Sequence, residues 1–364
     1  MKIIHLSDLH LGKRVNEFSM VEDQKDILDK ILAVVAGEKP DAVIIAGDVY
    51  DKGVPSGEAV GLLDDFLVSL SALTKNVFVI SGNHDSAERL AFGGRLIAPT
   101  GIRLSPVYDG AVEPITLCDE WGEVVFYPLP FVKPAAVRRF FGDEIGSYTD
   151  AMRAIIGKMN VDKTKRNVLI THQFVTGSRR TESEEISVGG ADNVDAAVFE
   201  PFDYVALGHL HAPQTLEGGK IRYCGTPLKY SFSEAKDVKS VTVVTLGAKG
   251  DLSIREVPLM PLRDMVEIRG KYEELTLKSF YERTTLRDDY VHVTLTDEED
   301  VPDAVGKLRV IYRNLMKLDY DNARTRKTVE IDGAKDVENK SPSQLFGELF
   351  ELQNNQPKIG RAHV

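Results

Sequence analysis

The chain has 364 residues, a net charge of −11 and 43% hydrophobic residues. This length exceeds what one hydrophobic core usually fills, so we expect two domains and a tail, and the ordinary composition excludes a largely disordered protein. No apolar run is long enough to cross a bilayer and none follows Met1 as a leader, so no membrane segment is expected. Cys118 and Cys224 are expected to be buried thiols rather than a disulfide, which suits the cytoplasm.

The first two thirds of the chain alternate short apolar strands with amphipathic helices. Strands are expected at residues 2–7, 41–46, 76–80, 123–127, 167–171, 204–207, 221–224 and 241–246. A capping box from Ser19 to Glu22 should open the first helix, and Gly37 and Pro40 should end it. A second helix follows from the leucine spacing between residues 63 and 73. This rhythm predicts parallel strands covered by helices.

The pattern changes near Pro258–Pro261. Strands at 264–269 and 290–296 and a helix at 303–317 predict a small α+β domain. A last amphipathic segment begins at Ser341 and carries Leu345, Phe346, Leu349, Phe350 and Leu352. The predicted domains are residues 1–260, 261–335 and a helical tail at 336–364.

Acidic, amide and imidazole side chains follow five of the predicted strands. These stretches are Asp8-Leu9-His10, Gly47-Asp48, Gly82-Asn83-His84-Asp85, Thr171-His172 and Gly208-His209-Leu210-His211. The carboxyl ends of parallel strands lie along one edge of a sheet, so the side chains should meet there. Asp-x-His and His-x-His place two side chains on the same side of an extended chain, and the glycines allow turns that aim the next residue inward.

This mixture of side chains predicts a metal centre. Five of the eight histidines lie in these stretches, whereas His5, His292 and His363 do not and are expected to be structural. Carboxylate, amide and imidazole ligands suit manganese or iron. Two ions about 3.5–4 Å apart, bridged by one carboxylate, could activate a water for in-line attack at phosphorus. The net negative charge weakly disfavours a nucleic-acid partner. Bound divalent ions would reverse the local electrostatic field that a phosphodiester meets at the site.

With these motifs in order, the chain resembles the calcineurin-like metallophosphoesterases, and within them the SbcD branch, the nuclease subunits of bacterial SbcCD complexes. The closer resemblance rests on residues 7–12, 189–195, 202–209 and 223–232. It implies an α/β fold, a sandwich of mixed β-sheets flanked by helices. A smaller α+β capping domain and a C-terminal helical tail would complete it.

The resemblance also implies a role for each motif residue. One ion would be held by Asp8, His10, Asp48 and His211, and the other by Asp48, Asn83, His172 and His209. The bridging carboxylate would be Asp48, and the ions would be manganese, with magnesium or iron as alternatives. His84 would face the scissile phosphate and stabilise or protonate the leaving oxygen. Asp85 would orient His84, cap the following helix, or do both.

The implied activity is that of a 3′→5′ double-strand exonuclease and a single-strand or hairpin endonuclease. It would act with the SMC-like ATPase SbcC in DNA end processing, replication, repair and recombination, as a homodimer within a heterotetramer. The capping domain would shape the DNA path. The tail would dock on the ATPase or pack on its own domain, and residues 55–73 would form a dimer surface or pack on the sheet.

Two other functions remain open at this point. A phosphatase or small-molecule phosphodiesterase could use the same metal centre, although phosphoprotein phosphatases carry a glutamate where this chain has Asp85. A single-domain phosphodiesterase would not need residues 262–335. A non-catalytic scaffold for DNA ends or for the ATPase is disfavoured because all seven ligand positions are intact.

Overall fold

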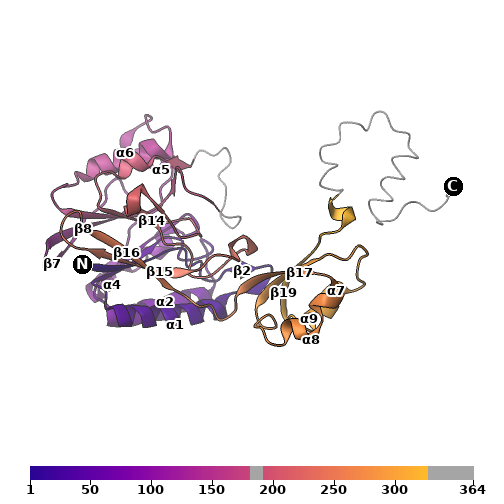
Figure 1. The fold of residues 1–364 in the computed structure, drawn as a ribbon. Helices are drawn as coiled ribbons and strands as arrows, with labels where there is room; N and C mark the ends of the chain where they lie inside the picture. The colour runs from indigo at the N-terminus through magenta and orange to yellow at the C-terminus, as the bar shows by residue number, and fades with distance from the viewer. Residues whose placement is uncertain (181–191, 327–364) are drawn as a thin grey trace, which may run out of the picture. The chain divides into compact units, whose positions relative to one another are not determined.

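The computed structural model describes residues 1–180 and 192–326, and the chain divides into two compact units that meet between Leu262 and Arg263. In the first unit, two six-stranded sheets pack face to face. Helices lie on the outer side of each sheet (Figure 1). The expected α/β sandwich of mixed sheets flanked by helices is therefore confirmed.

The first sheet has a parallel centre and an antiparallel edge. Its order is β16 (Leu252–Pro258), β15 (Ser240–Leu246), β1 (Lys2–Leu6), β4 (Ala42–Ala46), β5 (Val77–Ile80) and β6 (Ile102–Leu104). Strands β1, β4, β5 and β6 are parallel, whereas β15 and β16 run antiparallel to their neighbours. All five residues of β4 are buried, because helices cover one face of the strand and the second sheet covers the other.

The second sheet repeats this arrangement. Its order is β13 (Gln214–Leu216), β14 (Ile221–Tyr223), β12 (Tyr204–Gly208), β9 (Arg166–His172), β8 (Gly122–Pro128) and β7 (Ile115–Asp119). The four central strands are parallel, and β13 and β7 are antiparallel edges. The buried core between the sheets includes Ile44 and Phe78 from the first and Phe126 and Ile170 from the second.

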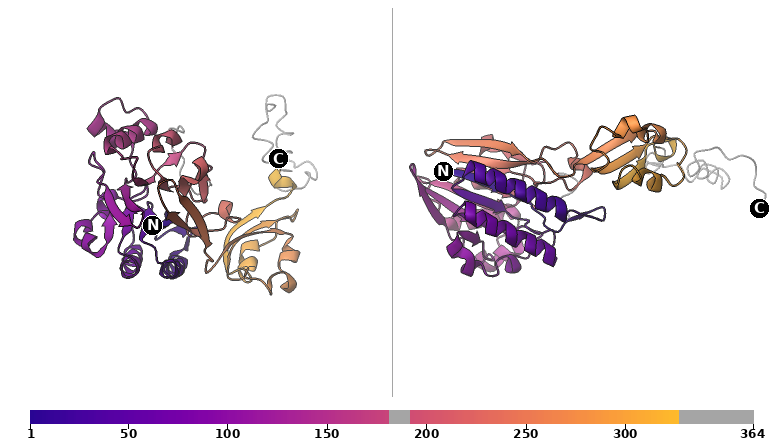
Figure 2. Two further views of the ribbon diagram at one scale, coloured as in Figure 1. Left: turned by 60° about the vertical axis from the view of Figure 1, so that its left-hand side comes forward. Right: turned by 90° about the horizontal axis from the view of Figure 1, so that it is seen from below.

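Helices cover the outer faces as the periodicity predicted. On the first sheet lie α1 (Val21–Glu38) and α2 (Gly57–Leu73), side by side in Figures 1 and 2, and on the second lie α5 (Pro134–Phe141) and α6 (Tyr148–Met159). The short elements are β2 (Arg14–Val15), β3 (Phe18–Ser19), α3 (Ala87–Leu90), α4 (Gly94–Ile97), β10 (Phe174–Val175) and β11 (Asn193–Val194). Single 3-10 turns, η1 to η4, lie at Ala98–Thr100, Ala196–Phe199, Glu217–Gly219 and Phe232–Glu234.

The predicted start of α1 was wrong, and the predicted end was right for Pro40, which follows the helix, but not for Gly37. Ser19 does not cap the helix, because it pairs with Arg14 in the β2–β3 hairpin and Met20 is the N-cap residue. At the other end, Gly37 stays helical and Lys39 adopts the left-handed conformation that stops the helix, with its N–H bonded to the carbonyl of Val35. Pairing with a neighbouring strand outweighed the local capping signal.

Both cysteines are free thiols, but only one matches the expectation. Cys224 is buried, whereas Cys118 is exposed on the edge strand β7. The prediction that both are buried was therefore wrong for Cys118. Its strand is covered on one face only, so alternate residues face solvent.

The second unit is a small α+β body around a three-stranded parallel sheet. The sheet consists of β17 (Met265–Gly270), β18 (Tyr290–Leu295) and β19 (Asn314–Tyr320), and the helices are α7 (Tyr272–Leu275), α8 (Lys278–Tyr281) and α9 (Ala304–Arg309). The helix predicted at residues 303–317 was therefore too long, because its second half forms β19. Parallel neighbours need a crossover, and α9 supplies the one between β18 and β19.

The amphipathic segment predicted from Ser341, within the tail at 336–364, lies outside the described residues, as does His363. Within the ranges 1–180 and 192–326, no helix has the length and apolar character needed to span a membrane.

Candidate metal centre

The predicted ligands lie at the carboxyl ends of strands from both sheets. Asp8, Asp48 and Asn83 follow β1, β4 and β5 of the first sheet, whereas His172 ends β9 and His209 follows β12 in the second. The expectation of a single sheet edge was wrong in this respect. The centre forms where the carboxyl edges of two packed sheets meet, and the core between the sheets fixes their spacing.

Asp48 lies at the middle of the centre. Its Oδ2 atom is 3.7 Å from Nε2 of His10 and 3.3 Å from Nε2 of His172. The residue is 2% exposed. A single carboxylate therefore faces imidazoles delivered by both sheets, which is the geometry needed for a carboxylate shared by two ions.

One ligand group lies on the β1 side of Asp48. Atoms of Asp8, His10 and His211 that can bind a metal lie within 4.8 Å of one another. The Nε2 atoms of His10 and His211 are 3.2 Å apart. Asp8 is fixed by the backbone N–H of His209, which donates to both of its carboxylate oxygens at 3.0 and 3.2 Å.

The second group lies around the amide of Asn83. Its Oδ1 atom is 3.0 Å from Nε2 of His172 and 3.0 Å from Nδ1 of His209. The Nε2 atom of His209 is buried and has no hydrogen-bond partner. An amide oxygen facing two imidazoles, with Asp8, Asp48 and His172 also within 4.8 Å of one another, fits a second cation.

Several of the candidate ligand residues adopt a backbone conformation that non-glycine residues rarely take. The φ angles are 52° at Asp8, 45° at His10, 46° at Asp48 and 106° at His209. Left-handed conformations cost free energy at non-glycine residues and persist where the surroundings enforce them, which happens most often at functional sites. The surrounding fold therefore holds these loops in their unfavourable backbone conformation.

The glycines before the ligands act mainly by leaving space. Only Gly47 has a left-handed φ, of 88°. A Cβ atom on Gly82 would lie 2.1 Å from Oδ1 of Asp48, and one on Gly208 would lie 2.0 Å from the carbonyl oxygen of Ala46. The sequence prediction that all three permit sharp turns was therefore correct for Gly47 alone, and the other two permit close approach.

His84 borders the centre on its open side. Its Nε2 atom is 4.0 Å from Oδ2 of Asp48, and its side chain is 20% exposed, whereas that of His10 is 1% exposed. Nδ1 of His84 is 3.1 Å from the carbonyl oxygen of Asp51. The ring therefore reaches both the ligand cluster and the side from which a substrate would arrive.

Asp85 does not orient the ring of His84 as expected, nor does it cap α3. Its carboxylate accepts the backbone N–H groups of Val49 at 3.0 Å, Tyr50 at 2.8 Å and Gly82 at 2.9 Å. The N-cap residue of α3 is Ser86. Asp85 instead joins the loop after β4 to the loop after β5, and so positions the segments that carry Asp48 and Asn83.

Burial and mutual charge shift the ionisation of the ligand cluster. Burial raises the pKa of Asp8 to about 6, and the negative charge of Asp48 adds to this rise. Burial opposes ionisation of His172, but the carboxylate of Asp48 raises its pKa to about 9. Burial and the neighbouring His172 lower the pKa of His209 to about 3. The acids and imidazoles therefore compete for protons, which divalent cations would replace.

The buried carboxylate of Glu234, next to His211, was not predicted from the sequence. Oε1 of Glu234 is 3.4 Å from Nδ1 of His211, and its Oε2 is 2.5 Å from Nζ of Lys239. Glu234 is fully buried in η4. Carboxylates behind a metal-binding imidazole fix its tautomer and direction. No spacing rule could have found Glu234, since it lies 23 residues from His211 on an irregular segment.

A second network holds the loop after β1. The side-chain amide nitrogen of Gln24 donates to the carbonyl oxygen of His10 at 2.7 Å, and its amide oxygen accepts the N–H of Gly12 at 2.9 Å. The hydroxyl of Tyr230 donates to the carbonyl oxygen of Leu9 at 2.6 Å. Gln24 was not singled out from the sequence, because its hydrogen bonds are to residues of another segment.

Two of the other histidines are structural, as predicted. Nδ1 of His5 lies 2.8 Å from the hydroxyl of Tyr204 inside the core. His292 lies between Glu267 at 3.1 Å and Asp319 at 2.8 Å on the sheet of the second unit. The strand-end positions, rather than the histidines as such, therefore mark the site.

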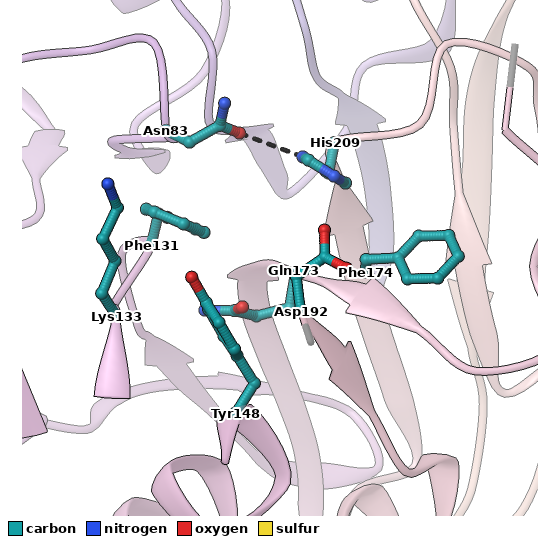
Figure 3. A pocket seen from close by; sticks show the side chains of 8 residues that line it. All are labelled: Asn83, Phe131, Lys133, Tyr148, Gln173, Phe174, Asp192 and His209. Atoms are coloured by element: carbon teal, nitrogen blue, oxygen red, sulfur yellow. Dashed lines mark hydrogen bonds between the residues drawn. The ribbon is translucent and has the colours of Figure 1, made fainter. Parts of the chain in front are cut away.

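A pocket of about 200 Å³ opens beside two of the candidate ligands. Its lining consists of Asn83, Phe131, Lys133, Tyr148, Gln173, Phe174, Asp192 and His209 (Figure 3). The ammonium of Lys133 and the hydroxyl of Tyr148 point toward the space below Asn83 and His209. A molecule bound at the candidate metal centre would lie next to this pocket, because Asn83 and His209 belong to both.

Comparison with known proteins agrees with this geometry. A model of the calcineurin-like phosphoesterase family matches residues 1–213. A second family model, named SbcD_C and described as the type 5 capsule protein repressor C-terminal domain, matches residues 261–354.

Two curated relatives match most of the chain. The chain is 34% identical over 369 aligned positions to the SbcD subunit of the nuclease SbcCD from Staphylococcus epidermidis, covering 98% of this chain and 97% of the relative. It is 36% identical to the same subunit from Staphylococcus saprophyticus, covering 75% and 73%. A solved dimetal phosphatase from Danio rerio is 11% identical with a TM-score of 0.44, covering 72% of this chain and 98% of that one. The chain therefore belongs to the calcineurin-like phosphoesterases, in the SbcD family of nuclease subunits.

Proposed function

We propose that the chain is a DNA nuclease that hydrolyses phosphodiester bonds at a centre of two divalent cations. The observation that carries the proposal is the placement of Asp48 between imidazoles from both sheets, at 3.7 Å from His10 and 3.3 Å from His172. Such a carboxylate can bridge two ions. Two bound cations would supply Lewis-acid stabilisation of the phosphate and would activate the attacking water.

Seven residues would hold the two cations, four at each position with one shared. The first set is Asp8, His10, Asp48 and His211, and the second is Asp48, Asn83, His172 and His209. The donor chemistry fits, since oxygen and imidazole ligands suit manganese, and magnesium or iron(II) are the alternatives. Buried Nε2 of His209, which lacks a hydrogen-bond partner, is one atom that such an ion would satisfy.

The chain's own residues would orient the phosphate and move the proton. His84 lies on the open side of the centre, so its Nε2 would donate a proton to the leaving oxygen or stabilise its charge. The carbonyl of Asp51 accepts from Nδ1 and holds the ring in that direction. Asp85 would act indirectly, by keeping the two ligand loops together through three backbone hydrogen bonds.

DNA as the substrate and an ATPase as the partner follow from the relatives, which are named as SbcD subunits of the nuclease SbcCD. We propose that this chain likewise acts on DNA ends and hairpins, as a 3′→5′ exonuclease and an endonuclease in repair and recombination. It would work with an SbcC-type ATPase, as a homodimer within a heterotetramer in the cytoplasm. Residues 261–335 would form the capping domain along the DNA path, and residues 336–364 would dock on the ATPase.

The experiment compares the manganese-loaded protein with its His84→Ala variant on duplex ends and single-stranded DNA. The wild type should degrade DNA in a manganese-dependent way. The variant should lose about 100-fold or more of the rate, because general acid catalysis contributes about 10²–10⁴-fold, while calorimetry shows unchanged metal binding. Full activity in the variant would remove the role of His84.

A phosphoserine peptide tests the other enzyme class. The proposal predicts that DNA is hydrolysed and the peptide is not. Faster hydrolysis of the peptide would favour a phosphatase, and activity on neither substrate would favour a scaffold.

A further inference from the structure

The pocket beside Asn83 and His209 has the chemistry of a binding site for more than a phosphate. Two candidate ligands of one cation form part of its wall, so a phosphate held there would direct its attached group into the pocket. The remaining lining is partly aromatic, with Phe131, Tyr148 and Phe174 around the opening. Nothing in the hydrolysis described above uses these side chains.

The aromatic rings form a surface suited to a flat ligand. The ring centroids of Phe131 and Tyr148 are 6.4 Å apart, with the planes tilted by 37°. The guanidinium of Arg180 lies 3.8 Å from the ring centroid of Phe174 and covers that ring. Phe131 and Tyr148 therefore lie side by side in the lining, whereas one face of Phe174 is covered by Arg180. Nucleobases stack on such rings with little dependence on sequence.

Two buried acceptors lining the pocket lack a donor. The Oε1 atom of Gln173 and the Oδ1 atom of Asp192 have no hydrogen-bond partner, and the residues are 1% and 7% exposed. The amide nitrogen of Gln173 already donates to the carbonyl oxygen of Val132 at 3.2 Å. The other oxygen of Asp192 accepts from Arg180 at 2.5 Å. Unsatisfied buried acceptors are costly, so each favours a ligand that brings an N–H or O–H group.

This requirement distinguishes between the two parts of a nucleotide. A phosphodiester carries only acceptors, and the carboxylate of Asp192 would repel it. A nucleobase carries N–H donors on its edge and a flat face for stacking. The exposed ammonium of Lys133 at the pocket suits a neighbouring backbone phosphate.

We infer that this pocket binds the base of one unpaired DNA nucleotide attached to the scissile phosphate. Tyr148 stacks on the base, and Gln173 and Asp192 accept hydrogen bonds from its edge. The inference rests on the proposed function, because the phosphate must lie at the metal centre for the base to reach the pocket. A base inside a duplex cannot enter, so the nucleotide at the cleavage position must leave its stack.

The test measures binding rather than hydrolysis. The manganese-loaded protein is titrated calorimetrically with inorganic phosphate, 2-deoxyribose 5-phosphate and thymidine 5′-monophosphate. All three present a phosphate to the cations, but only the nucleotide carries a base. The nucleotide should bind roughly tenfold more tightly than the sugar phosphate, as expected for one stacked base. Equal affinities for these two ligands would overturn the inference without any variant.

Substitutions then locate the base. Tyr148→Ala should remove most of the tenfold preference, and Tyr148→Phe should keep it, because the ring remains. Trp121→Ala removes an aromatic ring that is 58% exposed on the turn between β7 and β8, and it should leave the preference unchanged. A preference that persists in Tyr148→Ala would overturn the assignment of the pocket.

The same titrations separate this inference from the proposed function. If the protein cleaves DNA but shows no preference for the nucleotide, the base-binding role of the pocket is rejected and the nuclease function is retained. If the protein prefers the nucleotide but does not cleave DNA, the nuclease function is rejected and the nucleotide-binding pocket is retained.

Discussion

Buried charges around the ligands are satisfied by specific partners. Glu234 is fully enclosed, and burial alone would favour its neutral form. The hydrogen bond from His211 and the charge of Lys239 outweigh burial and lower the pKa of Glu234 to about 2. The carboxylate therefore stays charged at neutral pH and fixes the direction of a candidate metal ligand.

Replacing Glu234 should weaken metal binding without altering any ligand. We expect Glu234→Gln to raise the Kd for manganese about 10- to 100-fold, since partners behind a metal-binding imidazole have effects of that size. Titration calorimetry measures the change. Glu256→Gln is the matched control. Glu256 lies on β16 and also forms an ion pair, with Arg222 of β14, but its side chain is 50% exposed. Equal affinities in the two variants would show that Glu234 has no such role.

Gly82 should tolerate no side chain. A Cβ atom there would lie 2.1 Å from Oδ1 and 2.4 Å from the backbone nitrogen of Asp48. Gly82→Ala should therefore displace Asp48, abolish tight manganese binding and cost about 1–3 kcal/mol of unfolding free energy. Urea unfolding and calorimetry measure both effects.

Gly61→Ala provides the control for Gly82→Ala. Gly61 lies within α2 with open space around its Cα atom, so alanine should stabilise the helix by about 0.5–1 kcal/mol. A Gly82→Ala variant that binds manganese like the wild type would contradict the close approach of the two loops.

At the scale of elements, strand ends set the positions of charged groups outside the metal centre as well. Arg166 begins β9 and is 3% exposed. Its guanidinium donates to Asp119 at the end of β7 at 2.5 Å and to the carbonyl oxygen of Gly247 at 2.9 Å. Gly247 follows β15 of the first sheet, so this one side chain joins the two sheets at the end away from the ligands.

The ion pair predicts a dependence of stability on pH. The hydrogen bond from Arg166 lowers the pKa of Asp119 well below its ordinary value near 4. A lowered folded pKa gives stability that is present above the unfolded pKa and is lost as pH falls through the folded one. Asp119→Asn should be about 3 kcal/mol less stable at pH 7, because it leaves Arg166 buried without its charge partner.

Urea unfolding at pH 7, 5 and 3 checks this expectation. The difference between Asp119→Asn and the wild type should stay constant from pH 7 to 5 and shrink below pH 4. A difference that does not change with pH would mean that the charge of Asp119 contributes nothing.

At the scale of the whole molecule, the candidate metal centre lies where two separate sheets pack against each other. The ligands from β1, β4 and β5 and those from β9 and β12 converge only when the sheets pack. Cations bound at this site would therefore bind only the state in which the sheets are packed, and they would stabilise that state by mass action.

Removing the metal should lower the melting temperature of the first unit. Manganese at about 100 times its Kd would contribute about 2.7 kcal/mol, which corresponds to roughly 5–10 °C for a domain of this size. Differential scanning calorimetry with manganese and with a chelator measures the shift. His84→Ala should show the same shift as the wild type if His84 is not a ligand, and a much smaller shift would make it one.

The sequence by itself determined the parts of this protein that depend on local pattern. Runs such as Ala42–Ala46 are apolar on both faces and so predicted buried parallel strands, and the polar residues that follow each strand predicted the ligand set. The resemblance to the SbcD family, carried by those motifs, is confirmed by relatives at 34–36% identity.

Only the tertiary structure decided what depends on contacts between distant residues. The meeting of candidate ligands from two sheets instead of one, the pairing of Ser19 with Arg14 and the strand at Asn314–Tyr320 each override a local signal through partners elsewhere in the chain. Glu234 behind His211 and the three backbone N–H groups held by Asp85 have no spacing that sequence could reveal. Periodicity specifies which face of an element is buried, whereas hydrogen bonds across the fold specify what each buried group meets.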